Sequence, residues 1–453
     1  MSDIAFQPAH RLAEAIRRRE VSSRELLEHY LDRVDRLNPP LNAVVTLDAD
    51  GARATADAAD AALARGDVIG LLHGVPMTIK DCYDTAGMRT TCGVEEWDYV
   101  PERDADAVRR LRDAGAVIFG KTNTPALTAD WQTYNPIFGV TNNPWDTTRS
   151  CGGSSGGSAA ALAAGLTALE LGSDIAGSIR VPSNWCGTCG HKPSFGVVPQ
   201  RGHLPSPPGS LADRDLNVVG PMARDIEDLE LALDILAGPA GDQAKGWHLE
   251  LSAARAKVLS DLRLAVWLDD PAYPVEDDVR DVLETAVTAL RKAGARIVDS
   301  SPPAPLPELV LLHMELLYPV MEPSSEMLHR NWLSVNEKRE QLRIRIAEFF
   351  RDNDALLMPV AVVPAIPHTH DQPLARREIR TTGGSRSYLD MFGWAGLATV
   401  AYLPATTVPV GRTQTGLPVG IQIVGPYLED RTTLAVARCL EELLGGFVPP
   451  PGF

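Results

Sequence analysis

The spacing of apolar residues along the chain first predicts helices. Between residues 8 and 38 apolar side chains recur at helical intervals, and Ser22 with Glu25 has the pattern of a helix-capping box. Residues 51–65 are rich in Ala and Asp and also predict a helix. We expect these N-terminal helices to form an outer layer of the protein rather than its reactive part.

From residue 71 onward, short apolar runs alternate with helical segments. The runs predict strands at 75–79, 116–119, 168–171, 263–267, 296–298, 355–359, 399–410 and 418–424. The helical segments lie at 104–114, 156–166, 276–293 and 429–444. This alternation predicts an α/β fold with one large domain, in which helices cover both faces of a mixed, mostly parallel, twisted sheet.

The pattern is weaker between residues 303 and 390. Prolines cluster at 302–306 and 359–373, and methionines and other apolar residues lie between the two clusters. We expect irregular, partly apolar structure here. Two interpretations stay open, a lid over an apolar substrate pocket and ordinary helix packing.

Length and charge narrow the class of protein. A chain of 453 residues allows two or three domains, although large α/β enzymes of this length often form one. The net charge of −16 and the pI near 5.1 argue against nucleic acid or an anionic membrane as the default partner. No apolar run is long enough for a membrane span, and the first thirty residues lack a secretory signal pattern. We therefore expect a cytoplasmic protein.

The cysteines predict no metal site. Six are present, and Cys186 and Cys189 have the C-x-x-C spacing. No second pair or Cys/His cluster completes four zinc ligands, so we expect reduced thiols that pack in the interior.

Two glycine-lined, serine-bearing turns, at 152–158 and 172–178, are the strongest candidates for chemistry. An Ala-rich helical run separates them, and Arg180-Val-Pro-Ser follows the second. Glycine lets backbone N–H groups face a bound oxygen, and a serine in such a turn is a candidate nucleophile. A pair of ordinary surface turns is the alternative, but it does not explain why both turns flank one helix.

Two nearby motif matches are rejected. Residues 115–122 fit the Walker A pattern, but the residues at 116–119 predict a buried strand where a phosphate loop is needed. Residues 152–156 fit the G-x-S-x-G elbow, which must follow a strand directly. The preceding stretch, 143–150, is polar and contains proline, so we expect no strand there.

At these turns the chain resembles the amidase signature family. The matching segments are Gly152–Ser158, the 24-residue step from Ser154 to Ser178, Gly74–Asp81, Gly120–Pro125 and Gly416–Gly425. The resemblance covers roughly the whole length, with little of it between about 240 and 390. It implies one amidase signature domain over residues 1–453. Its parts would be a helical layer at 1–65, a catalytic core at 66–235, a lid or substrate-side region at 300–390 and the C-terminal part of the sheet at 391–453.

The resemblance also implies the reaction and its residues. Ser178 would be the nucleophile, Lys80 the base and Ser154 the relay between them, with a cis peptide bond between Gly153 and Ser154. Ser155 would support the relay by hydrogen bonding. A lysine can act as a base only when neutral, so burial must lower its pKa from about 10.4; the alternative for Lys80 is a strand-end lysine that reaches solvent. Such a cycle requires no metal, nucleotide or organic cofactor.

The oxyanion hole would be formed by the backbone N–H groups of Ile175, Ala176, Gly177 and Ser178. The family usually has Asp-x-Gly-Gly-Ser here, whereas this chain has Ala176 at the first glycine. Either the backbone never needed glycine at 176, or the oxyanion pocket has a different shape. Asp174 and Arg180 would brace the turn, and a surface ion pair is their alternative.

The substrate is less defined than the reaction. Thr128, Ala129, Trp131 and Tyr134 match the region that lines the acyl side in family members, although they could equally be plain core. The aromatic pair favours hydrolysis of aryl or bulky apolar amides, with related carbamates (urethanes) and esters accepted. The alternatives are the glutamine-hydrolysing component of a tRNA-dependent amidotransferase and an inactive binding protein on an amidase scaffold. A homodimer is suggested only by analogy with the family.

Overall fold

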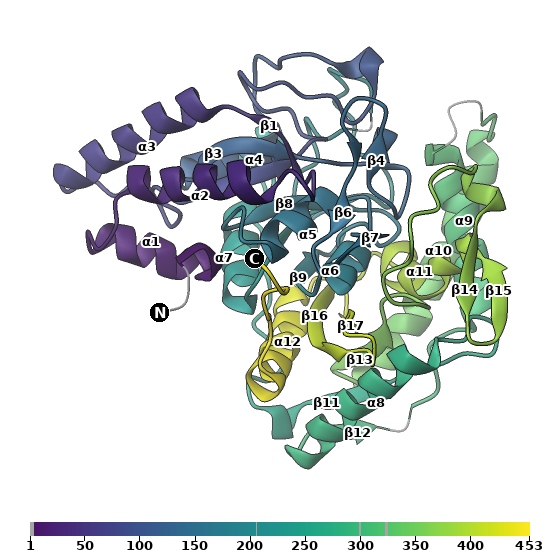
Figure 1. The fold of residues 1–453 in the computed structure, drawn as a ribbon. Helices are drawn as coiled ribbons and strands as arrows, with labels where there is room; N and C mark the ends of the chain where they lie inside the picture. Colours follow the sequence, from purple (N-terminus) through teal and green to yellow (C-terminus); the bar gives the residue numbers. More distant parts are fainter. Residues whose placement is uncertain (1–3, 205, 299, 322–324) are drawn as a thin grey trace.

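An eight-stranded sheet forms the centre of the molecule in the computed structural model, which describes residues 4–204, 206–298, 300–321 and 325–453 (Figure 1). Its strands in spatial order are β12 (Arg296–Val298), β11 (Arg263–Val266), β13 (Ala355–Pro359), β17 (Pro418–Val424), β16 (Ala405–Arg412), β9 (Cys189–Lys192), β10 (Val218–Ala223) and β8 (Glu170–Asp174). Strands β10, β13 and β17 are entirely buried, which explains why their sequences are largely apolar and lack polar alternation. Strands β8 and β9 are also buried but contain charged residues.

A second sheet of three strands lies beside the β8 edge. Its order is β1 (Val44–Leu47), β3 (Val117–Thr122) and β2 (Pro76–Lys80), and β2 pairs with β3 in parallel. Three small hairpins complete the strands: β4 (Tyr134–Asn135) with β5 (Gly139–Val140), β6 (Asn142–Asn143) with β7 (Asp146–Ser150), and β14 (Glu378–Thr381) with β15 (Gly384–Ser387).

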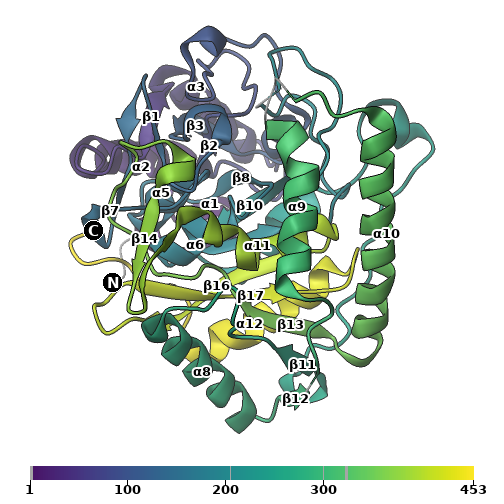
Figure 2. The ribbon, with the colours of Figure 1, turned by 90° about the vertical axis from the view of Figure 1, so that its right-hand side faces the viewer.

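Helices cover both faces of the central sheet. They are α1 (Ala9–Arg17), α2 (Ser23–Leu37), α3 (Ala49–Ala64), α4 (Asp106–Asp113), α5 (Gly156–Ala163), α6 (Arg180–Cys186), α7 (Ile226–Leu236), α8 (Asp277–Lys292), α9 (Leu306–Met321), α10 (His329–Asp352), α11 (Phe392–Val400) and α12 (Asp430–Leu444). Helices α5, α6 and α11 lie on one face and α8 and α12 on the other, while α9 packs on α11 with α10 beside it (Figure 2). Short 3-10 turns lie at Ile4–Phe6, Glu95–Trp97, Ala126–Thr128, Gly241–Lys245, Leu259–Asp261, Leu374–Arg376 and Tyr388–Met391.

The predicted N-terminal helices are confirmed. Ser22 is the N-cap of α2: its hydroxyl accepts from the Glu25 N–H, and the Glu25 carboxylate accepts from the Ser22 N–H. Helices α1 to α3 lie at the outer edge of the molecule, beside the three-stranded sheet (Figure 1). The α/β class and the mixed sheet are also confirmed.

The expectation of a mostly parallel sheet is wrong. Among the described residues of the eight-stranded sheet, only two pairings are parallel, those of β11 with β12 and of β11 with β13. Every pairing from β13 through β17, β16, β9 and β10 to β8 is antiparallel. The length of the connections explains such pairings. For example, a short turn joins β16 directly to β17, and a turn this short permits only an antiparallel pair.

Three predicted elements differ from the structure. The polar stretch before Cys151 contains a strand, β7, in a small hairpin outside the central sheet, so the reason given against a nucleophile elbow does not hold as stated. Residues 399 and 400 end helix α11 instead of starting a strand. The region expected to be irregular contains the long helices α9 and α10, because Pro305 and Pro307 lie at the start of α9, where proline is tolerated.

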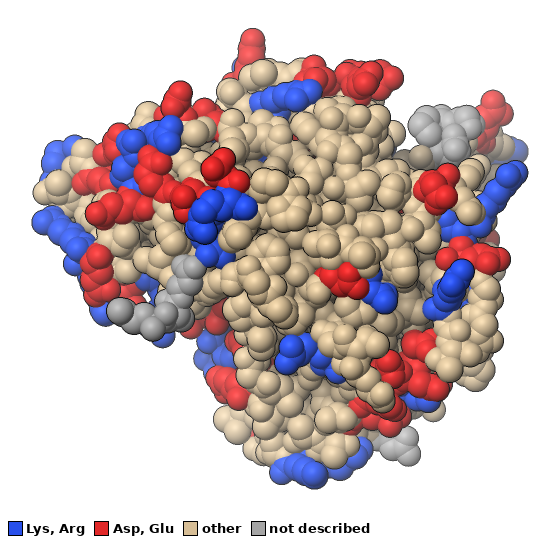
Figure 3. All heavy atoms as spheres, viewed as in Figure 1, with Lys and Arg blue, Asp and Glu red and all other residues tan. Residues whose placement is uncertain are grey.

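The surface carries interspersed charges. Figure 3 shows acidic and basic side chains together over the N-terminal helices, while the middle of the same face is largely uncharged. Among the described residues, no helix is both long enough and apolar enough to cross a membrane.

Candidate active site

Lys80 is the last residue of β2 and is completely buried. Its Nζ lies 2.6 Å from Ser154 Oγ and 3.1 Å from Ser173 Oγ. Burial removes the ammonium form from water, and this desolvation lowers the pKa of Lys80. The side chain therefore does not reach solvent, and its neutral form is favoured where two hydroxyls face it.

A second buried lysine in the neighbouring strand provides a contrast. Lys121 Nζ lies 3.7 Å from the carboxylate of Asp81 and donates to the Tyr83 carbonyl at 2.6 Å. Lys80 has no carboxylate within ion-pair distance among the described residues. Desolvation lowers the pKa of Lys121 as well, but the nearby Asp81 opposes this shift. Of these two lysines, Lys80 is the one that faces two serine hydroxyls and no carboxylate within ion-pair distance, so its surroundings suit a general base better.

The turn that carries Ser154 is held closely by its surroundings. The Gly153–Ser154 peptide bond is cis, which agrees with what the resemblance implies. The Thr124 hydroxyl donates to the Ser154 carbonyl at 3.1 Å. A Cβ atom on Gly153 would lie 2.6 Å from the carbonyl oxygen of Asp130, so no larger residue fits at that position without a shift of the backbone.

Asp174 organises the turn of residues 174–180, which we call the nucleophile loop. Its carboxylate accepts from the Gly177 N–H at 2.8 Å and from the Ile179 N–H at 3.1 Å. Gly177 has a φ of 99°, a value that favours glycine. Ser178 follows it and is 5% exposed. The Ser178 carbonyl accepts from the Ser155 N–H at 3.1 Å, which joins the two serine-bearing turns.

Arg180 and Asp174 form a buried ion pair, not a surface one. The guanidinium lies 2.9 Å from the carboxylate, and both side chains are almost completely excluded from solvent. Burial by itself raises the pKa of Asp174, but the charge and hydrogen bonds of Arg180 outweigh it and hold that pKa well below its usual range. Arg180 also donates to Gln422 on β17 and to Thr399 on α11, so the nucleophile loop is fixed to the C-terminal part of the fold.

The N–H groups expected to form an oxyanion hole fall into two kinds. That of Gly177 is bonded to Asp174. The N–H groups of Ile175, Ala176 and Ser178 make no hydrogen bond within the described residues. Ala176 does not take a positive φ, so the backbone at this position does not need the glycine that is usual in the family.

The structure brings together some of the predicted residues but not all. Lys80 and Ser154 are in hydrogen-bond contact, and Ser155 exchanges hydrogen bonds of 3.4 Å with the backbone of Ser173. No hydrogen bond joins the side chains of Ser154 and Ser178 in the part of the chain that is described. Catalytic hydrogen bonds are often long in the absence of substrate, so the second step of the relay is left to a functional test.

Comparison with known proteins identifies the family. The family model described as Amidase matches residues 25–322 and 312–434. This chain belongs to the amidase family. The A component of the glutamyl-tRNA(Gln) amidotransferase of Bdellovibrio bacteriovorus is 30% identical over 97% of this chain and 97% of its own length. Indoleacetamide hydrolase of Bradyrhizobium diazoefficiens is 31% identical over 96% of this chain and 86% of its own length.

Solved structures of amidase-family enzymes have the same fold. The structure of 6-aminohexanoate cyclic dimer hydrolase complexed with substrate is 26% identical and has a TM-score of 0.81, with 99% of each chain covered. The relatives bear names that refer to different substrates, and a fold shared by different activities does not identify a substrate. Membership of the amidase family therefore supports hydrolysis of amide carbon–nitrogen bonds and leaves the specificity to the local site.

The predicted substrate-side residues lie at different depths in this amidase. Trp131 is buried, and its indole N–H donates to the Ala176 carbonyl at 2.8 Å. Tyr134 lies further out and accepts from Arg377 at 2.8 Å. Thr128 is the last residue of a 3-10 turn, and Ala129 is its C-cap. Among the described residues, neither side chain makes a hydrogen bond with the nucleophile loop.

Several residues at the site have no recognisable sequence signal. His313 on α9 donates to the Ile175 carbonyl at 3.1 Å. Phe392 packs edge-on against Trp131, with ring centroids 4.4 Å apart. Tyr388 and Arg377 both donate to the buried carboxylate of Asp130. His313, Arg377 and Tyr388 come from the stretch 303–390 that the sequence pattern left poorly defined, and Phe392 follows it directly. Ser173, the second hydroxyl near Lys80, lies inside the glycine-lined turn at 172–178.

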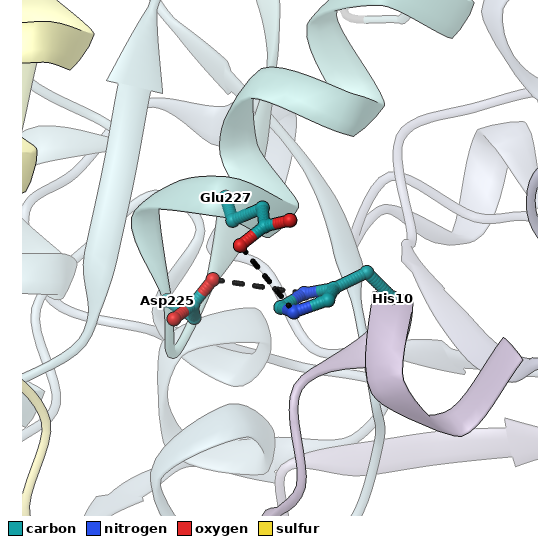
Figure 4. Close-up of side chains that lie close together, drawn as sticks. All are labelled: His10, Asp225 and Glu227. Atoms are coloured by element: carbon teal, nitrogen blue, oxygen red, sulfur yellow. Dashed lines mark ion pairs between the residues drawn. The ribbon is translucent and has the colours of Figure 1, made fainter. Parts of the chain in front are cut away.

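One cluster elsewhere has the residue types of a metal site. His10, Asp225 and Glu227 place one ligand atom each within 4.8 Å of one another, at the contact between α1 and the start of α7 (Figure 4). His10 Nδ1 is already bonded to Asp228 at 2.8 Å, and Asp228 also accepts from the N–H groups of Ala9 and His10. These contacts explain the cluster as part of the packing of α1 against the start of α7.

The cysteines match the expected packing role. All six are free thiols, and five are buried. Cys186 Sγ donates to the Cys151 carbonyl, while Cys189 Sγ donates to the Arg224 carbonyl. The two residues of the C-x-x-C pattern therefore contact different parts of the chain.

Proposed function

We propose that this amidase hydrolyses amides through an acyl-enzyme formed on Ser178. The observation that carries the proposal is the 2.6 Å contact between the buried amine of Lys80 and the hydroxyl of Ser154, beside the turn that holds Ser178. A neutral amine in this place can accept the Ser154 proton, and Ser154 can then accept the proton of Ser178.

The proposed cycle balances its protons within these three residues. Ser178 Oγ attacks the substrate carbonyl as its proton passes to Ser154 and the Ser154 proton passes to Lys80. The tetrahedral intermediate collapses when Ser154 gives a proton to the leaving nitrogen and Lys80 returns one to Ser154. Water then attacks the acyl-enzyme carbonyl and gives a proton through Ser154 to Lys80. The bond to Ser178 Oγ breaks as Ser154 returns a proton to that oxygen and Lys80 returns one to Ser154, which releases the acid.

The negative oxygen of the intermediate would be bound by backbone N–H groups of the nucleophile loop. We assign this role to Ile175, Ala176 and Ser178, since their N–H groups have no partner among the described residues. Gly177 is left out because its N–H donates to Asp174. Preorganised donors of this kind usually make one of the largest contributions to acyl transfer.

For the substrate we propose aryl or bulky apolar amides, with carbamates and esters as further substrates. The support is the aromatic group of Trp131, Phe392 and Tyr388, which packs beside the nucleophile loop. We expect this aromatic group to face the substrate, where it suits an apolar acyl group better than the polar side chain of glutamine. The esters and carbamates follow from the mechanism, since the same acyl-enzyme accepts other leaving groups.

A second candidate is the glutamine-hydrolysing component of a tRNA-dependent amidotransferase. The 30% identity over nearly the whole length with the A component of such an enzyme favours it. A protein of this kind would hydrolyse glutamine and act together with partner proteins. A rate comparison of the purified chain on a nitroanilide, a carbamate, a fatty amide and glutamine separates the two proposals, because the first expects the nitroanilide to be fastest.

Covalent labelling tests the mechanism. We expect a fluorophosphonate to add one phosphonyl group to Ser178, measured by intact mass and peptide mapping. Ser178→Ala should abolish labelling and lower kcat by about 10⁴-fold or more, and Lys80→Ala should lower kcat to a similar extent. Ser252→Ala and Lys245→Ala, both at exposed positions, are the matched controls and should retain full activity. Normal turnover by Ser178→Ala would exclude the mechanism.

A further inference from the structure

His313 is a buried side chain that the proposed cycle does not use. It lies on α9 and is fully excluded from solvent. Its Nε2 is 3.1 Å from the Ile175 carbonyl oxygen. A carbonyl oxygen can only accept, so Nε2 carries the hydrogen. Nδ1 has no partner within the described residues, and desolvation lowers the pKa of His313 to about 4, so the ring is neutral near pH 7.

This hydrogen bond sets the direction of the next N–H group. The peptide bond between Ile175 and Ala176 is trans, so its carbonyl and its N–H point in opposite directions. With the Ile175 oxygen held on His313, the Ala176 N–H is turned away from α9. That N–H makes no hydrogen bond to any described residue.

The following peptide is fixed in the same way. Trp131 Nε1 donates to the Ala176 carbonyl at 2.8 Å, and the N–H on the other side of that peptide, from Gly177, donates to Asp174 at 2.8 Å. Both ends of this second peptide are therefore bonded. The first peptide differs, because only its carbonyl is bonded and its N–H is left available to a ligand.

We propose that His313 is a positioning residue that holds the 175–176 peptide so that the Ala176 N–H faces the carbonyl oxygen of the substrate. This inference rests on the proposed function, since it assumes an oxyanion at the nucleophile loop. His313 does not touch the reacting atoms and acts only through the Ile175 carbonyl. Phe392, whose ring lies 5.7 Å from that of His313 and 4.4 Å from that of Trp131, connects the two side chains that hold this loop.

The inference predicts a loss in kcat more than in KM. A donor that meets the oxyanion only in the transition state contributes little to substrate binding. Removing one oxyanion donor outright typically costs about 10²- to 10³-fold in kcat. Releasing the peptide that carries it should cost less, so we expect His313→Leu to lower kcat on a nitroanilide about 10- to 100-fold with KM changed less than about threefold.

Three variants at residue 313 make the test specific. The side-chain amide nitrogen of Gln can occupy about the place of Nε2, whereas that of Asn corresponds to Nδ1. We expect His313→Gln to restore most of kcat and His313→Asn not to restore it. His73→Leu is the matched control, because His73 is also fully buried and its Nδ1 accepts from the Ile69 N–H far from the nucleophile loop; it should leave kcat unchanged.

The outcomes separate this inference from the proposed function. If Ser178→Ala is inactive while His313→Leu keeps the wild-type kcat, the role of His313 is wrong and the mechanism stands. If Ser178→Ala is active, both the proposed mechanism and the proposed role of His313 are wrong. Should His313→Leu fail to fold, the comparison of Gln with Asn decides: equal kcat values in two folded variants, with matching near-ultraviolet circular dichroism, would overturn the role.

Discussion

Two regions meet at the candidate active site and differ in how far they expose large apolar side chains. The segment that contains the proposed catalytic residues, residues 76–186, which we call the catalytic segment, buries Lys80, Asp174 and Arg180 and gives each of them hydrogen-bond partners. The covering segment, residues 306–392, also buries polar side chains such as His313, but it exposes several large apolar ones, among them Leu311 at 63% and Ile344 at 62%. The first region contains the family's motifs, whereas the second contains none that we could recognise.

The difference bears on where the proposed reaction and the proposed substrate preference are encoded. The proposed nucleophile, base and relay all come from the catalytic segment, and these are the parts that a family resemblance can transfer. The covering segment supplies His313, which donates to the Ile175 carbonyl, and Tyr388 and Arg377, which donate to Asp130. A family whose members act on different substrates is expected to keep the first region and vary the second.

The largest expected effect contrasts an ion pair in each region. Arg180→Met leaves the Asp174 carboxylate buried without its partner, and we expect the free energy of unfolding to fall by about 3–5 kcal/mol and activity to be lost. Arg345→Met removes an exposed pair with Glu308 in the covering segment and should cost less than about 1 kcal/mol. Urea denaturation of both variants measures the contrast. Similar losses would show that burial of the Asp174–Arg180 pair does not determine its contribution to stability.

A smaller effect is expected where the two regions are tied together. Arg377 and Tyr388 of the covering segment both bond to Asp130, next to Trp131. Arg377→Met should loosen this wall and lower the preference for a bulky aryl amide over a small amide about tenfold in kcat/KM. Arg376→Met, at an exposed neighbouring position, is the control. An unchanged ratio of the two kcat/KM values would show that Arg377 does not contribute to substrate specificity.

The smallest expected effect is a change in pH dependence within the catalytic segment. The lowered pKa of Lys80 means that kcat/KM should rise with pH and level off below the usual lysine range. Glu170 is buried; desolvation raises its pKa to about 7, and its negative charge raises the pKa of Lys80. Glu170→Gln should therefore move the rise in kcat/KM to lower pH. A shift to higher pH would contradict this electrostatic coupling.

Thermal unfolding gives an independent check on Glu170. Its folded-state pKa lies above the unfolded value of 4.5, so wild-type stability falls as the pH rises from about 4.5 to 7. Glu170→Gln removes that loss. The Tm of Glu170→Gln minus the Tm of the wild type should therefore be larger at pH 8 than at pH 5. An equal difference at the two pH values would show that the Glu170 carboxyl does not titrate in this range.

The catalytic segment could be predicted from sequence because its signals are local. The strand that ends at Lys80, the glycine turns and the α/β alternation all depend on residues near one another in the chain. The contact between His313 and Ile175 spans 138 positions, and nothing in the helical pattern around His313 separates it from an ordinary core histidine. Contacts between residues so far apart in the sequence can be identified only in the three-dimensional structure.

The wrong predictions have similar physical causes. The prolines before α9 suggested irregular structure, yet at the first turn of a helix they replace N–H groups that would be unpaired anyway. Strand direction was misjudged because buried apolar runs occur in both parallel and antiparallel sheets once both faces are covered. The role of Ala176 was left open because the φ angle at one position in a turn is not encoded in the residue type alone.

The hydrogen bonds of Arg180 to Thr399 and Gln422 join residues that are synthesised at very different times. During synthesis, residues 80, 154 and 178 leave the ribosome more than two hundred positions before the chain that completes this anchor. The emerging polypeptide thus contains all three proposed reacting groups before the residues that bond to Arg180 have been made. The contacts that fix the nucleophile loop to the C-terminal part of the fold can form only when translation is nearly finished.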